Sequence, residues 1–352
     1  MDFGKLVRQN IRDLVPYSSA RDEYTGESAI FLDANENPFN APYNRYPDPH
    51  QLELKAKIGA LKGLPVENIF LGNGSDEAID LLYRVFCEPG EDNVVSIHPS
   101  YGMYQVCADI NNIACKKVAL NDDFSLDAKA LVHAVDDKTK LLFICSPNNP
   151  TSNSFDAETI LDLVKKLNVI VVVDEAYIDF SKRQSLLEYV HEYPNLLILQ
   201  TFSKAWGLAG IRLGMALGSR EVIALMGKVK YPYNLNVLTL KFALDALKNK
   251  DKVDGWIAAV LEQRDLLERK LKKFRFVRQV YPSDANFLLV QVDKARKIYN
   301  YLVEKKIIVR DRSNVELCEG SLRITIGTDT ENLALTDALM QYQRDFVDSC
   351  KI

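Results

Sequence analysis

The sequence predicts an α/β protein in which a large domain with a mostly parallel sheet is followed by a smaller α+β domain. Three observations support this fold class. Between residues 66 and 218, short apolar runs alternate with amphipathic segments, which is the pattern of βαβ units. Beyond residue 235 the alternation of short strands and helices gives way to two longer helical stretches, which indicates a domain junction. A length of 352 residues is also more than one domain usually holds.

We expect an N-terminal segment, 1–35, that packs on the small domain or on a partner subunit, then a large domain, 36–235, and a small domain, 236–352. The strands of the large domain are expected to be buried on both faces, because their residues are apolar without alternation. These strands are expected at 69–71, 94–97, 141–145, 169–173, 196–199 and 213–217, with helices at 76–87, 101–110, 156–167 and 219–228. In the small domain, strands are expected at 286–292, 307–310 and 322–326, with helices at 239–248, 253–273, 294–305 and 329–347.

The composition argues against several classes of function. A net charge of −4 with both signs interspersed gives no basic surface for nucleic acid. No stretch approaches the roughly 20 apolar residues that a membrane span needs, and residues 1–8 lack the apolar core of a secretory signal, so we expect a cytoplasmic protein. The six cysteines form no C-x-x-C pair and the four histidines are scattered, so we expect reduced thiols and no metal site.

The segment 201–214, TFSKAWGLAGIRLG, carries the strongest chemical signal. Lys204 lies just after a buried strand, where partial desolvation would favour its neutral amine, and such an amine can form an imine. Arg212 follows across glycines that let the backbone turn tightly, so its guanidinium can hold a phosphate with help from the Ser203 hydroxyl. Taken alone, a lysine in this place is more often a surface residue at the end of a strand.

A run of β-branched residues, 169–173, is followed directly by Asp174. Ligands of open α/β sheets bind at the carboxyl ends of the strands, so this carboxylate is placed to keep a pyridine nitrogen protonated. Tyr177, three residues further on, can reach a ring oxygen of the same cofactor. For a lone aspartate at a strand end, a helix N-cap or a magnesium ligand would be an equally good interpretation.

Two turns beside expected strands add further polar groups. In the segment 145–151, CSPNNPT, two prolines fix a turn that presents the Asn149 amide at the sheet edge, where it can donate to a ring oxygen. The segment 72–79, GNGSDEAI, leads into a helix whose N–H groups can bind phosphate, with Ser75 or Asp76 as the helix cap. Each turn alone is a weak signal, and the segment 72–79 is neither a dinucleotide fingerprint nor a P-loop.

Together these segments resemble, in order and spacing, the motifs of the class II aminotransferases that use pyridoxal 5′-phosphate (PLP), and the resemblance spans essentially the whole chain. It implies fold type I, the aspartate-aminotransferase-like fold, with a mostly parallel seven-stranded sheet. It also implies that the ring of Tyr101, which alone would be a core residue, stacks on the pyridine. Ser152 departs from the glycine that the family usually has there. The residues implied to bind PLP are Gly74, Ser75, Asp76, Tyr101, Asn149, Asp174, Tyr177, Ser203, Lys204 and Arg212, of which Lys204, Asp174 and Tyr177 would be catalytic.

Two segments near the N-terminus narrow the resemblance to the histidinol-phosphate aminotransferases. The segments 33–38, DANENP, and 45–49, RYPDP, resemble a motif whose tyrosine crosses a dimer interface to the partner's PLP phosphate. The resemblance implies that role for Tyr46, and it implies contacts with the substrate for Asn37 and Tyr17. Without the lysine segment, these residues would be interpreted as a polar loop with turn prolines.

Arg310 and Arg323 lie at or within expected strands of the small domain. An arginine inside a strand is costly unless it is paired with an anion. The resemblance implies that Arg323 receives a carboxylate or phosphate of the substrate and that Arg310 is a second arginine characteristic of the histidinol-phosphate enzymes. It also makes Asn149 a substrate contact. Ion pairs with internal carboxylates are the alternative for both arginines.

The resemblance implies a homodimer that transfers the amino group of L-histidinol phosphate to 2-oxoglutarate, giving imidazole acetol phosphate and glutamate in histidine biosynthesis. A threonine-phosphate decarboxylase and an aromatic amino-acid aminotransferase are alternatives of the same fold. A non-catalytic PLP-fold sensor attached to a DNA-binding module is disfavoured, because the aminotransferase-like segment begins near residue 15. The decarboxylase differs in its product, since it would release carbon dioxide.

Overall fold

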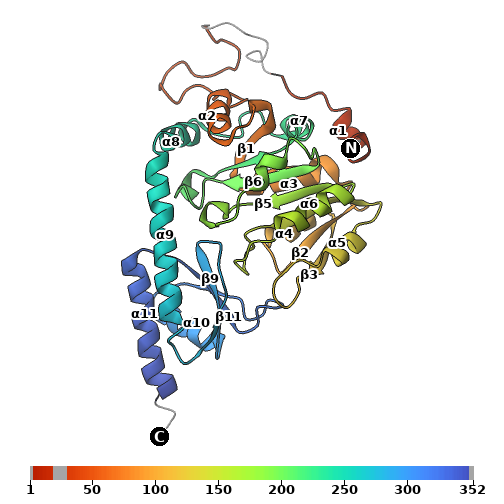
Figure 1. The fold of residues 1–352 in the computed structure, drawn as a ribbon. Coiled ribbons are helices and arrows are strands. Elements are labelled where there is room, and N and C mark those ends of the chain that lie inside the picture. Colours follow the sequence, from red (N-terminus) through yellow and green to blue (C-terminus); the bar gives the residue numbers. More distant parts are fainter. Residues whose placement is uncertain (1–2, 19–29, 349–352) are drawn as a thin grey trace.

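The computed structural model describes residues 3–18 and 30–348, which form a large sheet-based unit and a smaller one below it (Figure 1). The large sheet has seven strands in the order β1-β7-β6-β5-β4-β2-β3. Its strands are β1 Ile69–Asn73, β2 Asn93–His98, β3 Ala114–Ala119, β4 Thr139–Cys145, β5 Ile170–Asp174, β6 Leu196–Thr201 and β7 Leu213–Leu217. Every neighbouring pair is parallel except the two that include β7. The expected mostly parallel seven-stranded sheet is therefore confirmed.

Strand β7 runs antiparallel to both of its neighbours, although it is apolar on both faces as parallel strands usually are. The reason lies in its connection to β6, which spans only residues 202–212. A parallel connection needs a crossover of a dozen or more residues, usually with a helix, and this loop is too short for one. An apolar run shows that both faces of a strand are covered, but it does not give the direction of the strand.

Helices cover both faces of the large sheet. On one face α3 Gly74–Phe86, α4 Met103–Ile110 and α7 Arg220–Val229 pack, and on the other α2 Leu52–Lys62, α5 Ala128–Ala134 and α6 Ala157–Lys166 pack. Along β5, Ile170 and Val172 point into the core beneath α3, α4 and α7. Val171 and Val173 point into the core on the opposite face, beneath α2, α5 and α6. This alternation between two cores explains why the strand is a continuous apolar run.

The small domain is built on a four-stranded antiparallel sheet in the order β10-β11-β9-β8. The long helix α9 Lys250–Leu271 runs from α8 Val237–Leu247 down to this domain (Figure 1). The remaining elements are β8 Val277–Val280, β9 Phe287–Val292, α10 Ala295–Glu304, β10 Arg310–Asp311, β11 Ser321–Thr325 and α11 Asp329–Gln343. This is the expected α+β arrangement, except that the strand expected at 307–310 is only the two residues of β10.

The described part of the N-terminal segment packs on the large domain rather than on the small one. Residues 3–12, which include α1 Gln9–Arg12, place Leu6, Val7 and Ile11 in the core beneath α3 and α7, and Arg8 forms an ion pair of 3.0 Å with Glu88. Part of the expected segment 1–35, residues 19–29, lies outside the described residues. The expected domain boundary near residue 236 stays a prediction, and α8, which follows it, contacts α2 of the large domain.

Candidate active site

The predicted cofactor residues come together at the carboxyl ends of adjacent strands. Strand β5 ends at Asp174, Lys204 follows β6, Asn149 follows β4, and Gly74 begins α3 directly after β1. Because β1, β7, β6, β5 and β4 are consecutive in the sheet, these strand ends meet along one edge. A pocket of about 190 Å³ opens there, lined by Gly74, Ser75, Asp76, Tyr101, Cys145, Asn149, Asp174, Ala176, Tyr177, Thr201, Ser203, Lys204, Ala209 and Arg212.

Lys204 is the lysine that lines this pocket among the described residues. Among the described residues, its Nζ has no hydrogen bond or ion pair, and it lies 5.5 Å from the centre of the Tyr177 ring. Burial lowers the pKa of Lys204, and the guanidinium of Arg323 lowers it further. Both effects favour the neutral amine, which is the form that attacks a carbonyl carbon.

Asp174 is a buried carboxylate at the base of the pocket, with an exposed fraction of 2%. Its two oxygens accept hydrogen bonds from the Tyr104 hydroxyl at 2.9 Å and from the Ala176 N–H at 3.1 Å. Burial raises the pKa of Asp174 to about 6, although these two hydrogen bonds oppose the rise. A cation delivered beside Asp174 would therefore be strongly favoured, because no described residue forms an ion pair with this carboxylate.

An anion cradle lies at the start of α3. The first-turn N–H groups of a helix have no intrahelical acceptor, and Arg212 places its guanidinium beside them. Gly74 has a φ of +73°, and a Cβ there would lie 2.6 Å from Arg212 Nη2, so only glycine fits. The Gly74 N–H itself donates to the Arg212 carbonyl at 3.0 Å. Ser75 and Asp76 are therefore the residues whose N–H groups remain for an anion.

The sequence assigned the helix cap to Ser75 or Asp76, and this assignment is wrong. Helix α3 begins at Gly74 after Asn73, and no side chain caps it. The Asp76 carboxylate instead accepts a hydrogen bond from the Tyr101 hydroxyl at 3.0 Å and lies 3.5 Å from Arg212 Nη2. This carboxylate orients the tyrosine ring and the guanidinium from inside the first helical turn.

One hydrogen bond joins the two domains across the site. The Arg323 guanidinium of β11 donates to Asn149 Oδ1 at 2.5 Å, which leaves the amide nitrogen of Asn149 facing away from that bond. Arg323 also lies over the Phe287 ring at 5.3 Å, and Tyr177 packs edge-on against the same ring at 5.2 Å. The alternative of an ion pair to an internal carboxylate is not found for Arg323 among the described residues.

Five predicted residues do not line the pocket within this chain, and one of them, Arg323, borders it through its hydrogen bond to Asn149. Tyr46 is 51% exposed and stacks on Tyr233 at 4.5 Å, and Tyr17 is 70% exposed. Asn37 accepts a hydrogen bond from the Phe39 N–H at 3.0 Å, in the loop that carries Tyr46. Arg310 is exposed on the small-domain sheet. Three of the five, Tyr17, Asn37 and Tyr46, therefore lie in N-terminal segments, and the other two lie on the small-domain sheet.

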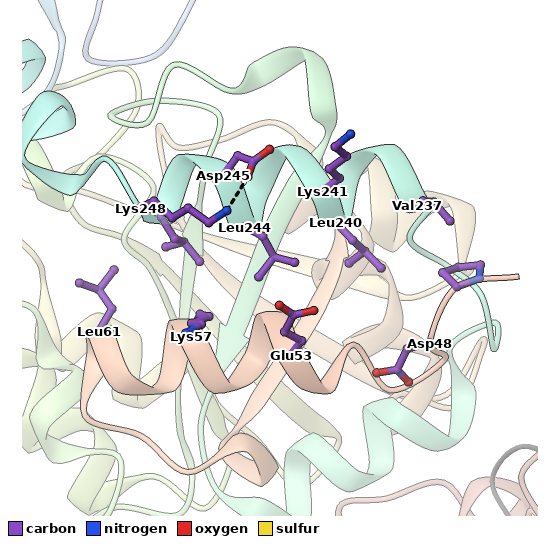
Figure 2. Close-up of a pocket in the computed structure, with 12 residues that line it drawn as sticks. Asp48, Glu53, Lys57, Leu61, Val237, Leu240, Lys241, Leu244, Asp245 and Lys248 are labelled. Atoms are coloured by element: carbon purple, nitrogen blue, oxygen red, sulfur yellow. Dashed lines mark hydrogen bonds and ion pairs between the residues drawn. The ribbon is translucent and has the colours of Figure 1, made fainter. Parts of the chain in front are cut away.

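A larger groove, of about 580 Å³, lies away from this pocket between α2 and α8 (Figure 2). Leu240 and Leu244 of α8 point toward α2, whose Lys57 faces them (Figure 2). Its charged groups have both signs, and Lys248 pairs with Asp245 at 2.8 Å. The groove gathers no set of groups that could carry one reaction, so size alone does not identify the site.

Other classes of site are not supported by the described residues. They contain no cluster of histidine, cysteine or acidic residues that could hold a metal ion. Within residues 3–18 and 30–348, no helix combines the length and the apolar character needed to cross a bilayer. The cysteines that the structure describes are all free thiols.

A comparison with known families identifies the family of the chain. Residues 30–339 match the family model of the aminotransferases of class I and II. The chain belongs to this family. The expected family and fold type I are confirmed, and with them the expectation of an enzyme that transfers amino groups.

Individual relatives of this aminotransferase agree with the family match. It is 56% identical to the histidinol-phosphate aminotransferase of Parabacteroides distasonis over 96% of this chain and 98% of that protein. Its structure resembles the histidinol-phosphate aminotransferase of Sinorhizobium meliloti in complex with PLP, with a TM-score of 0.80 and 26% identity over 89% of this chain and 90% of the other. The L-threonine-O-3-phosphate decarboxylase of Porphyromonas gingivalis, at 20% identity and a TM-score of 0.73 over 86% and 92% of the two chains, shares the fold alone.

The sequence reasoning missed two buried residues that shape the pocket of this aminotransferase. Tyr104 of α4 donates its hydroxyl hydrogen bond to Asp174, and nothing in its sequence neighbourhood distinguishes it from an ordinary core tyrosine. Glu175 is 2% exposed and accepts hydrogen bonds from the Ser185 hydroxyl and the Gln200 amide. It fixes the chain that leaves β5. Its position directly after Asp174 gives no sequence signal of such a supporting role.

Proposed function

We propose that this aminotransferase uses PLP and transfers the amino group of L-histidinol phosphate to 2-oxoglutarate, giving imidazole acetol phosphate and glutamate in histidine biosynthesis. The observation that carries the proposal is the Lys204 amine, unpaired among the described residues, in one pocket with Asp174 and the Arg212 cradle. The identity of 56% to the Parabacteroides distasonis enzyme supports the choice of amino donor. A cytoplasmic location belongs to the same proposal, and the free cysteines of the described residues are compatible with it.

The residues of the pocket fit the chemistry of PLP group by group. The cradle of Ser75, Asp76 and Arg212 would hold the phosphate, and Gly74 leaves the space that this requires. Asp174 would hold the protonated ring nitrogen, whose positive charge offsets the burial of the carboxylate. When bound, PLP withdraws electrons from the α-carbon of the substrate and so makes its proton removable. Tyr101 would cover the ring, while Tyr177, Asn149 and Ser203 would contact its oxygens.

The protein's own groups then perform the proton transfers. Lys204 would act as the base, because burial and the guanidinium of Arg323 lower the pKa of its amine. It takes the proton from the substrate α-carbon and returns a proton on the same side of the pocket. Arg323 would orient the anionic end of the substrate, because within residues 3–18 and 30–348 its guanidinium has only the Asn149 amide oxygen as hydrogen-bond partner.

We further propose a homodimer in which Tyr46 contacts the cofactor phosphate of the partner subunit. The turn that carries Tyr46 is anchored within its own chain, since Glu36 pairs with Arg45 at 2.7 Å and accepts from the Tyr46 N–H at 2.6 Å. The side chain of Tyr46 nevertheless lies outside the pocket of its own chain and is half exposed. An active site formed by two subunits requires a turn of this kind, which is held in place by its own chain but presents a side chain outward. Tyr17 and Asn37, in the same N-terminal region, would contact substrate in the assembled dimer.

The proposed reaction is tested with purified protein, PLP, L-histidinol phosphate and 2-oxoglutarate. We expect glutamate to form in step with imidazole acetol phosphate. Release of carbon dioxide without glutamate would point to the decarboxylase alternative, and a preference for aromatic amino acids to the other aminotransferase. The Lys204→Ala variant should lose the visible absorbance of the bound cofactor and nearly all transamination. Retention of both by that variant would refute the assignment of Lys204.

A further inference from the structure

Three arginines share one face of the small-domain sheet. Arg310 of β10 and Arg323 of β11 are direct partners in the antiparallel pairing. The pairing continues one residue further, because the Arg312 N–H donates to the Ser321 carbonyl at 2.9 Å. Side chains alternate along a strand and directly opposed residues share a face, so Arg310, Arg312 and Arg323 lie on one face and Asp311 on the other.

Asp311 confirms this alternation and does not neutralise the arginines. Its carboxylate accepts hydrogen bonds from Arg296 of α10 at 2.9 Å and from the Ser313 hydroxyl at 2.5 Å. Both partners lie away from the arginine face. Asp311 therefore makes its hydrogen bonds on the side of the sheet that faces α10, away from the three arginines.

The arginine face is turned toward the pocket. Arg323 reaches Asn149 on the large domain, and Tyr177, which lines the pocket, lies against the Phe287 ring beneath Arg323. Burial raises the pKa of Tyr177 and lowers that of Arg323, and the positive charge of Arg312 is close enough to both residues to act against the first shift and add to the second. Arg312 therefore belongs to the rim between the cofactor pocket and the small domain.

Arg312 has a charged donor group without an acceptor. Its Nε is buried, and no side-chain or main-chain acceptor bonds to it among the described residues. Neither Arg310, Arg312 nor Arg323 forms an ion pair with a described carboxylate. Burial and the neighbouring Arg310 both lower the pKa of Arg312, so the local field is positive and unbalanced. An anion with several acceptor oxygens would balance it.

We propose that Arg312 binds the phosphate group of the amino donor, and that together with Arg310 and Arg323 it forms the recognition site for a dianion. This rests on the proposed function, in which the donor is a phosphorylated amine. A phosphate dianion offers more acceptor oxygens and more charge than the single carboxylate at the far end of glutamate. A third guanidinium therefore improves binding of the phosphorylated substrate more than binding of glutamate. Its loss should affect the half-reaction of histidinol phosphate more than that of glutamate.

The test compares Arg312→Gln with the wild type as PLP-loaded enzymes. Each half-reaction is followed by the absorbance change of the bound cofactor, first with L-histidinol phosphate and then with glutamate, and inorganic phosphate is added as an inhibitor of the glutamate half-reaction. Loss of one charged hydrogen-bond donor should raise the KM for histidinol phosphate and the inhibition constant of inorganic phosphate roughly tenfold to a hundredfold. The KM for glutamate should change several-fold less.

Arg278→Gln is the matched control. Arg278 lies on β8 of the same sheet, is exposed and pairs with Asp293 at 2.6 Å, so its loss changes the net charge equally without touching the site. Arg312→Lys keeps the charge and should recover part of the phosphate affinity. Equal losses for glutamate and histidinol phosphate, or unchanged phosphate inhibition in Arg312→Gln, would overturn the proposal. Absence of turnover of histidinol phosphate by the wild type would instead reject the proposed donor, while phosphate inhibition would still test Arg312.

Discussion

At the scale of single residues, Asp174 carries a destabilising charge until a cation is bound. Its folded-state pKa of about 6 lies above the ordinary value of 3.8. A raised pKa stabilises the fold only below the ordinary value, and this contribution is lost as the pH rises from about 4 through 6. At pH 8 the buried charge in the PLP-free protein therefore costs on the order of 3 kcal/mol relative to a neutral side chain.

Asp174→Asn should reverse that cost and abolish function. The PLP-free variant should melt at a higher temperature than the wild type at pH 8, and the difference should vanish near pH 4. With PLP, turnover should fall by roughly a hundredfold or more, because the ring nitrogen loses its anionic partner. Thermal unfolding across pH and steady-state rates measure both effects. If the variant is less stable than the wild type at pH 8, the buried charge of Asp174 does not destabilise the PLP-free protein.

Tyr104 is a positioning residue for Asp174, since its hydroxyl donates to the carboxylate and so lowers the aspartate pKa. Tyr104→Phe should move the pH midpoint of the stability loss described above upward, and it should weaken PLP binding by about 1.5–3 kcal/mol. Tyr83→Phe is the matched control. Tyr83 is also fully buried and stacks on Phe143 like Tyr104, but its hydroxyl donates to the Tyr104 carbonyl. An identical shift in both variants would mean that general loosening of this core explains the result.

At the scale of helices and strands, the sequence predicted the strands that are buried on both faces. The strands β2, β4, β5, β6 and β7 were found because their apolar runs reflect two covered faces. Strand β3 was missed because it is a sheet edge with a single buried residue, Val118, and contains Lys116 and Lys117. Helix α2 was missed because its buried positions are only Leu54, Ile58 and Gly59. Periodicity cannot indicate an element that buries so little.

The pocket was predicted more completely than the elements around it, because its residues cluster in short segments at strand ends. Lys204, Asp174 and Asn149 needed only the position of a strand to be placed. Tyr104 and Arg312 could not be found in this way, since a tyrosine within a helix and an arginine beyond a two-residue strand have no distinguishing neighbours in sequence. Their partners are known only once the sheets pair and the domains meet.

The turn after β4 contains a strained residue where the family usually has glycine. Ser152 is fully buried with a φ of +68°, and its hydroxyl donates to the Pro282 carbonyl of the small domain at 3.1 Å. Ser152→Gly removes strain of about 1 kcal/mol but also loses a hydrogen bond of similar worth, so stability should change by less than about 1 kcal/mol. Ser152→Ala keeps the strain and loses the hydrogen bond, and should cost about 1–3 kcal/mol. Denaturant unfolding gives the order of stability of the three proteins. An alanine variant as stable as the wild type would exclude the contribution of the hydrogen bond, and a glycine variant less stable than the alanine variant would exclude that of the strain.

At the scale of the whole molecule, the position of Tyr46 predicts that each active site needs two chains. Lys204→Ala and Tyr46→Ala homodimers should both be nearly inactive. A mixed dimer would contain one site with both defects and one with neither, so equal mixing with subunit exchange should restore about a quarter of wild-type activity. Verified heterodimers without activity would place Tyr46 in its own subunit's site or outside any site. Mixing Lys204→Ala with Asp174→Asn is the control, because those defects lie in separate sites of the mixed dimer and should not complement.

The pairing of β1 also determines when the pocket can form during synthesis. Strand β1 lies at the edge of the sheet as the described residues form it, and it pairs there with β7, more than a hundred residues further along the chain. The ribosome releases the chain from its amino terminus at roughly 5–20 residues per second, so the Gly74 turn waits unanchored for several seconds. A nascent chain stalled just after Arg212 already contains every residue that lines the pocket. It still lacks the strand that brings the two halves of the anion cradle together, so cofactor capture must follow the emergence of β7.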